Sequence, residues 1–240
     1  NLLGVLYAQV KLYEESIVNY SKAIKLNSKY FEAYNNIGVL YNSLKKNNKA
    51  VEYFDKAIEI KPSYAEAYNN KGNALKDKGE YKLAIGCYEK SLYLKPDYFD
   101  AIVNLGIAWD LMSELSKSKR YFKQALALNP TNTSALYNLA NCHYNAKEFE
   151  QSIEACQKII DLDRSFHFAY NRMGLCYIQL KKEKKAKSFF EQAIDVKPDY
   201  SEALTNYGFI LQKFRNYSLA SLQFEKVLRI DPTSDVALLN

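Results

Sequence analysis

Asparagine recurs at 34-residue intervals along most of the chain. The series is interrupted once, by an arginine, and consists of Asn36, Asn70, Asn104, Asn138, Arg172 and Asn206. An asparagine side chain carries both a hydrogen-bond donor and an acceptor, so it can pair with the amide and the carbonyl of an extended peptide backbone. We therefore predict that these six residues form a peptide-binding surface with little demand on the sequence of the bound segment. The alternative is that the amides bond within the protein itself.

Lysine is concentrated in one short stretch of the chain. The densest group consists of Lys181, Lys182, Lys184 and Lys185. Together with lysines at comparable positions of earlier segments, such as Lys45 and Lys82, this group predicts a basic rim that steers acidic partner segments. The alternative is a solvated edge without a ligand.

No pattern typical of catalysis is present in the sequence. It has no glycine-rich phosphate-binding loop and no histidine beside a nucleophile in a recognisable motif. With two histidines and four cysteines, none in a C-x-x-C pair, a zinc site is not expected. We predict no catalytic residue, no cofactor and no metal, and expect that the chain is not an enzyme.

The composition is that of a folded protein. Hydrophobic residues make up 48% and charged residues 25% of the 240 residues, and no apolar run approaches the roughly 20 residues of a membrane span. The net charge of +6 is modest, so nucleic acid is not a favoured partner. The four cysteines are expected to be buried, reduced thiols, which favours the cytoplasm. They are Cys87, Cys142, Cys156 and Cys176.

A 34-residue period organises the whole chain. All five prolines share one register, with Arg164 in the skipped position: Pro62, Pro96, Pro130, Pro198 and Pro232. Six of the eight glycines share another, with Ala140 in the gap: Gly4, Gly38, Gly72, Gly106, Gly174 and Gly208. Such a period indicates an array of small repeated structural units.

Each unit is predicted to be a pair of antiparallel helices. Residues 31–64 are typical, with apolar residues at i, i+3, i+4 and i+7 in the first half and a second helical set before Pro62. Glycine inside a helix costs about 1 kcal/mol relative to alanine. We therefore expect that the two helices approach closely, with Gly38 facing the small Ala50 and an aromatic residue such as Phe54 filling the space between helix pairs.

This pattern closely resembles the tetratricopeptide repeat (TPR) family. The residues that carry the resemblance are Tyr34, Ile37, Gly38, Tyr41, Ala50, Phe54, Ala57 and Pro62, and again Tyr68, Gly72, Ala84, Tyr88 and Pro96. The resemblance implies an all-α, right-handed superhelical solenoid whose first helices line a concave face. The asparagine register looks like that of the TPR region of O-linked N-acetylglucosamine transferases. The carboxylate clamp of chaperone-binding members is not expected, because Phe168 stands where that clamp needs a lysine.

The period also predicts the boundaries of the units. We expect a single TPR array over 1–240, with a partial repeat at 1–30, full repeats at 31–64, 65–98, 99–132, 133–166, 167–200 and 201–234, and the start of a further repeat at 235–240. Because the chain starts and ends inside a repeat, we expect it to be part of a longer array.

These observations favour a non-catalytic scaffold that binds an extended or helical segment of another protein on its concave face, within a larger assembly. One alternative is the substrate-selecting arm of a larger enzyme, such as a glycosyltransferase. Another is RNA binding through the basic rim.

Overall fold

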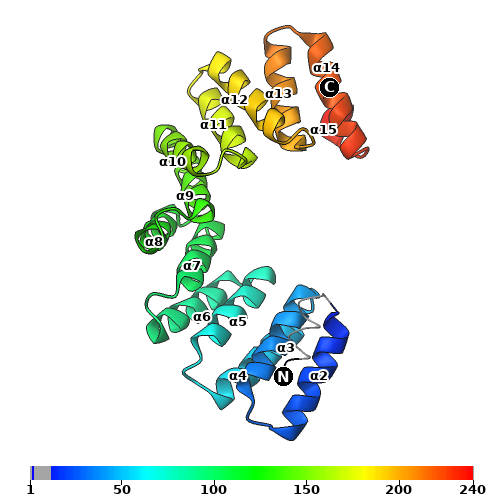
Figure 1. Ribbon diagram of the computed structural model, residues 1–240. Helices are drawn as coiled ribbons and strands as arrows, with labels where there is room; N and C mark the ends of the chain where they lie inside the picture. The colour runs from blue at the N-terminus through cyan, green and yellow to red at the C-terminus, as the bar shows by residue number, and fades with distance from the viewer. Residues whose placement is uncertain (1, 3–11, 240) are drawn as a thin grey trace. The chain divides into compact units, whose positions relative to one another are not determined.

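All regular structure in the described part of the chain is helical. The computed structural model describes residue 2 and residues 12–239, and these contain fourteen helices and no strand. Their order is shown in Figure 1. The helices are α2 (Tyr13–Leu26), α3 (Phe31–Ser43), α4 (Asn47–Ile60), α5 (Ala65–Asp77), α6 (Tyr81–Leu94), α7 (Phe99–Leu111), α8 (Leu115–Leu128), α9 (Thr133–Asn145), α10 (Phe149–Leu162), α11 (His167–Gln179), α12 (Glu183–Val196), α13 (Ser201–Lys213), α14 (Tyr217–Ile230) and α15 (Asp235–Leu238).

The chain divides into two compact units. Unit 1 is Asn1–Leu128 and unit 2 is Asn129–Asn240. In both units a first helix packs on the second helix of its own repeat, as α3 does on α4 and α11 on α12, and that second helix packs on the next first helix. The predicted all-α solenoid of helix pairs is therefore confirmed. No helix in the described residues is both long enough and apolar enough to cross a membrane.

The proline register explains where most second helices end. In α4, for example, the helix stops at Ile60, and Lys61 has a non-helical backbone conformation (φ −133°, ψ 85°) ahead of Pro62. A residue before proline is pushed out of the helical region by the proline ring. The repeat at 133–166 lacks the proline, yet α10 ends at the same register, because the Asp163 side chain accepts hydrogen bonds from the backbone N–H and the hydroxyl of Ser165 (2.8 and 2.6 Å).

The turn between paired helices has the same geometry in all six full repeats. One residue of each turn has a positive φ, between 57° and 81°, and only one of the six is glycine. They are Lys45, Gly79, Ser113, Lys147, Lys181 and Arg215. In the first of these turns the N–H of Lys46 donates to the carbonyl of Tyr41 (2.8 Å), which closes a Schellman motif. This shared left-handed position could not be predicted from the residue types, because five of the six residues that occupy it are not glycine.

The glycine register is explained by an aromatic ring. A Cβ atom built on Gly38 would lie 2.6 Å from Cε1 of Phe54, and the same conflict recurs between Gly106 and Phe122 at 2.8 Å. The expected close approach of the two helices is thus present, and the aromatic ring adds a contact at the glycine that the sequence analysis did not predict. The aromatic ring 16 residues later, rather than the small residue 12 residues later, excludes a side chain at the glycine. The small residue can instead donate a hydrogen bond to the carbonyl of the glycine, as Ser118 Oγ does to Gly106 O at 2.8 Å.

The repeat at 133–166 departs from this packing at two positions that face each other. It has Ala140 in place of the glycine and Cys156 in place of the aromatic residue, and both are fully buried. Without the ring, there is room for the alanine methyl group. The loss of the aromatic ring at Cys156 therefore compensates for the added methyl group at Ala140. From the sequence alone, the two changes could only be seen to occur in the same repeat.

Candidate functional site

The predicted asparagine register lies on the first helix of each repeat. In unit 1 it places Asn36 on α3, Asn70 on α5 and Asn104 on α7. In unit 2 it places Asn138 on α9, Arg172 on α11 and Asn206 on α13. All six side chains are half-buried. We call the asparagines of this register the outer row.

In unit 1 the outer row is hydrogen-bonded to the preceding repeat. The Asn70 side-chain amide donates to Oδ1 of Asn35 at 3.0 Å, and the Asn104 amide donates to Oδ1 of Asn69 at 3.0 Å. Asn35 and Asn69 are almost completely buried, with 5% and 4% of their surface exposed. They form an inner row, one residue before the outer row.

The inner row was missed in the sequence analysis. Its signal was present, because asparagine also stands directly before the outer row at Asn35, Asn69 and Asn171. A buried amide is costly unless its hydrogen bonds are satisfied, and the outer row satisfies it. Part of the asparagine repeat therefore has a structural reason.

The outer amides retain capacity for a ligand. An asparagine side chain can donate two hydrogen bonds and accept two. Among the described residues, the Asn104 side chain makes one hydrogen bond, its donation to Asn69. The Asn70 side chain donates to Asn35 and accepts one long contact, at 3.5 Å, from the Asn69 amide. Each therefore keeps an N–H and an oxygen lone pair, and the bond to the inner row fixes the orientation of the amide.

In unit 2 one outer-row asparagine pairs with an inner-row asparagine, and a carboxylate also bonds to the inner amide. The Asn206 amide donates to Oδ1 of Asn171 at 3.0 Å. The Asn171 amide in turn donates to Oε1 of Glu202 at 2.9 Å, and the Tyr200 hydroxyl donates to the other oxygen at 2.8 Å. Burial and this hydrogen bond to Glu202 raise the pKa of Tyr200, so the hydroxyl remains a donor at neutral pH.

Arg172 occupies the outer register with a different environment. Its guanidinium lies 4.7 Å from the ring centre of Tyr144 and hydrogen-bonds Tyr137. Burial raises the pKa of Tyr137 above its ordinary value, and Arg172 opposes part of this rise. Beside it, Phe168 is 39% exposed and contacts Tyr137 and Tyr200 at ring-centre distances of 5.9 and 5.4 Å. Around Arg172, the face of the first helices in unit 2 is therefore aromatic and cationic. The equivalent face of unit 1 carries a row of asparagine amides.

The basic-rim residues lie at the turn between α11 and α12. Lys181 and Lys182 belong to the turn, and Lys184 and Lys185 to the first turn of α12. All four are exposed. They lie at the end of the helix pair and not in the outer-row register.

The four cysteines lie within the packed interior of the helix pairs or at its border. Cys142, Cys156 and Cys176 are buried and Cys87 is half-buried, all as free thiols. Burial raises the pKa of Cys156 to about 12, which keeps the thiol protonated and unreactive at neutral pH. Within the described residues, no group of His, Cys, Asp and Glu side chains could hold a metal ion.

Solved structures, two of them of TPR proteins, share this architecture. YrrB, a TPR protein with an unusual peptide-binding site, is 27% identical over 77% of this chain and 95% of its own, with a TM-score of 0.64. MamA is 25% identical over 67% of this chain and 94% of its own, with a TM-score of 0.60. The C-terminal part of a TPR repeat-containing protein from Cytophaga hutchinsonii matches 98% of this chain and 96% of its own at 19% identity, with a TM-score of 0.75, which bears on the fold alone.

Family comparisons agree with the structural ones. No curated protein sequence matches the chain. Models of the tetratricopeptide repeat match residues 31–64, 65–98, 112–173 and 169–200, and a model of the TPR repeat matches 4–44. These matches span most of the chain, which therefore belongs to the tetratricopeptide repeat family.

Proposed function

We propose that this chain is a non-catalytic scaffold that binds an extended or helical segment of another protein along the face of its first helices. The contact residues are Asn36, Asn70 and Asn104 in unit 1, and Asn138, Arg172 and Asn206 in unit 2. TPR proteins bind other proteins, and YrrB, one of the more similar structures, has a peptide-binding site.

The observation that carries the proposal is the partial satisfaction of the outer amides. The bonds from Asn70 and Asn104 to the inner row hold these amides in place, so a ligand would not have to order them on binding. The remaining donor and acceptor of each amide match the two groups of a peptide unit. Pairing with backbone would leave the choice of partner to neighbouring side chains.

Site-specific photo-crosslinking in native cells tests the location of the site. A benzophenone amino acid at Val39, which is 40% exposed on α3, is expected to crosslink the partner. The same group at Tyr93, which is 78% exposed on the second helix α6, is expected not to do so. Partner crosslinks from position 93 but not from position 39 would place the partner on the second helices and contradict the proposal.

Substitution of the outer row tests its role. We expect the Asn70→Ala/Asn104→Ala double variant to bind the captured partner about tenfold more weakly, since each hydrogen bond contributes about 0.5–1.5 kcal/mol. Asn48→Ala, an exposed position on α4, is the control and is expected to bind as the wild type does. Because the inner amides lose their donors in the double variant, circular dichroism must show that it is still folded before its affinity is compared.

A further inference from the structure

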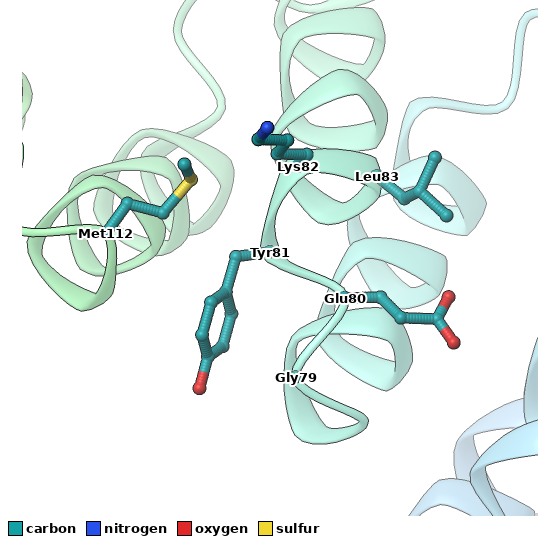
Figure 2. Close-up of a pocket in the computed structure, with 6 residues that line it drawn as sticks. All are labelled: Gly79, Glu80, Tyr81, Lys82, Leu83 and Met112. Carbon is teal, nitrogen blue, oxygen red and sulfur yellow. The ribbon is translucent and has the colours of Figure 1, made fainter.

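A groove with the same construction occurs in each of the two units, at the turn edge of the helix pairs. In unit 1 a cavity of about 380 Å³ is lined by residues 79–83 of one turn and by Met112 of the next repeat. Figure 2 shows Met112 reaching from its own helix pair toward Tyr81 and Lys82. In unit 2 a cavity of about 510 Å³ is lined by residues 181–185 and by Phe214. Every lining residue in unit 2 stands 102 positions after its counterpart in unit 1, so these are equivalent sites, which we call turn groove 1 and turn groove 2.

The two turn grooves differ strongly in charge. Turn groove 1 has one lysine, Lys82, and one acidic residue, Glu80. Turn groove 2 has four lysines and Glu183. A second cavity of about 430 Å³ adjoins it, shares Lys184 and Phe214 with it, and adds Lys187.

Most of this charge in turn groove 2 is not neutralised within the protein. Glu183 is paired with Lys213, and Lys187 with Glu191 at 3.4 Å. The ammonium of Lys185 lies 5.5 Å from the ring centre of Tyr177. In the part of the chain that the structure describes, no ion pair, side-chain hydrogen bond or ring contact engages the ammonium groups of Lys181, Lys182 and Lys184.

Local folding energetics do not favour these lysines. The helix α12 begins at Glu183, and Lys182 caps it without a side-chain hydrogen bond. The N-terminus of a helix carries a positive partial charge, so lysines around it are repelled where acidic residues would be favoured. An anionic ligand would offset this unfavourable electrostatic arrangement at the start of α12.

The groove also offers an apolar contact. The Phe214 side chain is 41% exposed although it lies beside the cavity. We propose that turn groove 2 binds an acidic segment of a partner protein, which places an apolar side chain against Phe214 and carboxylates on Lys181, Lys182 and Lys184. This site is separate from the outer-row face, so either can fail without the other.

An acidic peptide fits turn groove 2 better than RNA does. Glu183 lines the groove and Glu191 lines the adjoining cavity. Both carboxylates are already paired, Glu183 with Lys213 and Glu191 with Lys187, so they do not decide between the two ligands. A peptide can direct an apolar side chain onto Phe214 while its carboxylates meet the lysines, whereas a phosphate backbone offers no apolar group. The preference is therefore for negative charges around an apolar side chain.

Fluorescence anisotropy with the full chain tests this site. The probe is a labelled nine-residue peptide of glutamates with a central leucine, compared with the same peptide carrying a central glycine and with a labelled oligouridine RNA. We expect saturable, salt-sensitive binding of the leucine peptide, weaker binding of the glycine peptide, and the weakest binding of the RNA.

Two matched pairs of variants separate specific binding from general charge and from misfolding. Lys184→Glu is expected to weaken leucine-peptide binding about tenfold or more, while raising the melting temperature because it places a carboxylate at the start of α12. Lys82→Glu makes the same change at the equivalent position of turn groove 1 and is expected to leave binding unaltered. Phe214→Ala is expected to remove the advantage of leucine over glycine, and Met112→Ala is expected to keep it.

Three results would overturn the proposal. They are no saturable binding of the leucine peptide, equal losses in Lys184→Glu and Lys82→Glu, or tighter binding of the RNA than of the peptide. The last result would instead identify a nucleic-acid surface. None of them would bear on the crosslinks expected at Val39.

Discussion

At the scale of single residues, the glycine of a first helix and the aromatic ring of the second helix share one space. Phe54 is 1% exposed, and its ring occupies the position that a side chain at Gly38 would need. The exchange to Ala140 and Cys156 in the repeat at 133–166 shows that the pair can change together. The cost of altering either residue should therefore depend on the other.

A double-mutant cycle tests this coupling. We expect Gly38→Ala to lower the free energy of unfolding by about 1–3 kcal/mol, because the added methyl group displaces the Phe54 ring. In a Phe54→Cys background the same substitution is expected to cost less or to stabilise, since alanine favours helix over glycine by about 1 kcal/mol. Urea denaturation of the four proteins measures the coupling, and strictly additive effects would show that the two sites are independent.

The left-handed turn residues give a second prediction at this scale. Lys45 has a φ of 59°, while the equivalent Gly79 occupies the same conformation without a side chain. We expect Lys45→Gly to raise the free energy of unfolding by about 0.5–1 kcal/mol, because relief of the left-handed strain exceeds the greater entropy of the unfolded chain. The neighbouring Lys46→Gly, at a φ of −91°, is the control and is expected to destabilise. If both variants lost stability in urea denaturation, strain at position 45 would be too small to matter.

At the scale of the structural elements, an aspartate side chain stabilises the turn that follows two of the second helices, α10 and α14. Asp163 accepts hydrogen bonds from Ser165, and Asp231 accepts equivalent ones from the backbone and hydroxyl of Thr233 at 3.0 and 2.7 Å. These bonds hold the pKa of each carboxyl below its ordinary value. The turn is therefore stabilised by the ionised form.

The pH dependence follows from the direction of this shift. A carboxyl whose pKa is lowered on folding contributes its stability in full above its unfolded pKa of about 3.9 and loses it as the pH falls through the lower folded value. Asp163→Asn keeps an acceptor but cannot be protonated. We expect the wild type to melt at a higher temperature than this variant at pH 7 and the difference to shrink below about pH 4. A difference that stayed constant down to pH 2 would mean that the charge of Asp163 contributes nothing.

The sequence predicted the elements well and their contacts less well. Helix pairs follow from local information, namely the apolar spacing around Tyr34 and the proline that stops α4, so their first residues lie where the 34-residue period put them. The bond from Asn70 to Asn35 spans 35 residues and depends on how successive repeats pack, which no local pattern encodes. The left-handed Lys45 was hidden for a different reason, since lysine is not a residue type that marks this conformation. The roles of the outer row and of the basic rim remain predictions.

At the scale of the whole molecule, each repeat depends mainly on its neighbours. Repeat arrays have stabilities that are sums of local terms, so a defect should spread only a short distance. Phe54 in unit 1 and Phe190 in unit 2 occupy equivalent positions, and each is 1% exposed. They provide a matched pair of core positions, one in each unit.

Hydrogen exchange with mass spectrometry tests how far a defect spreads. We expect Phe54→Ala to accelerate exchange in α3–α6 and to leave α11–α14 at nearly the wild-type rate, because the cavity weakens only the nearby packing. Phe190→Ala is expected to give the reverse pattern. Uniform acceleration across both units by either variant would indicate that the chain unfolds as one cooperative body.

The exchange to Ala140 and Cys156 limits how such a gene can be rearranged. A crossover between two repeats that fell in the turn of a hairpin could join a first helix carrying alanine to a second helix carrying phenylalanine, and the two would collide. A crossover between hairpins keeps each matched pair together. Duplication and recombination should therefore have been tolerated mainly at the boundaries between repeats, so that the hairpin, and not the single helix, is the segment that is inherited intact.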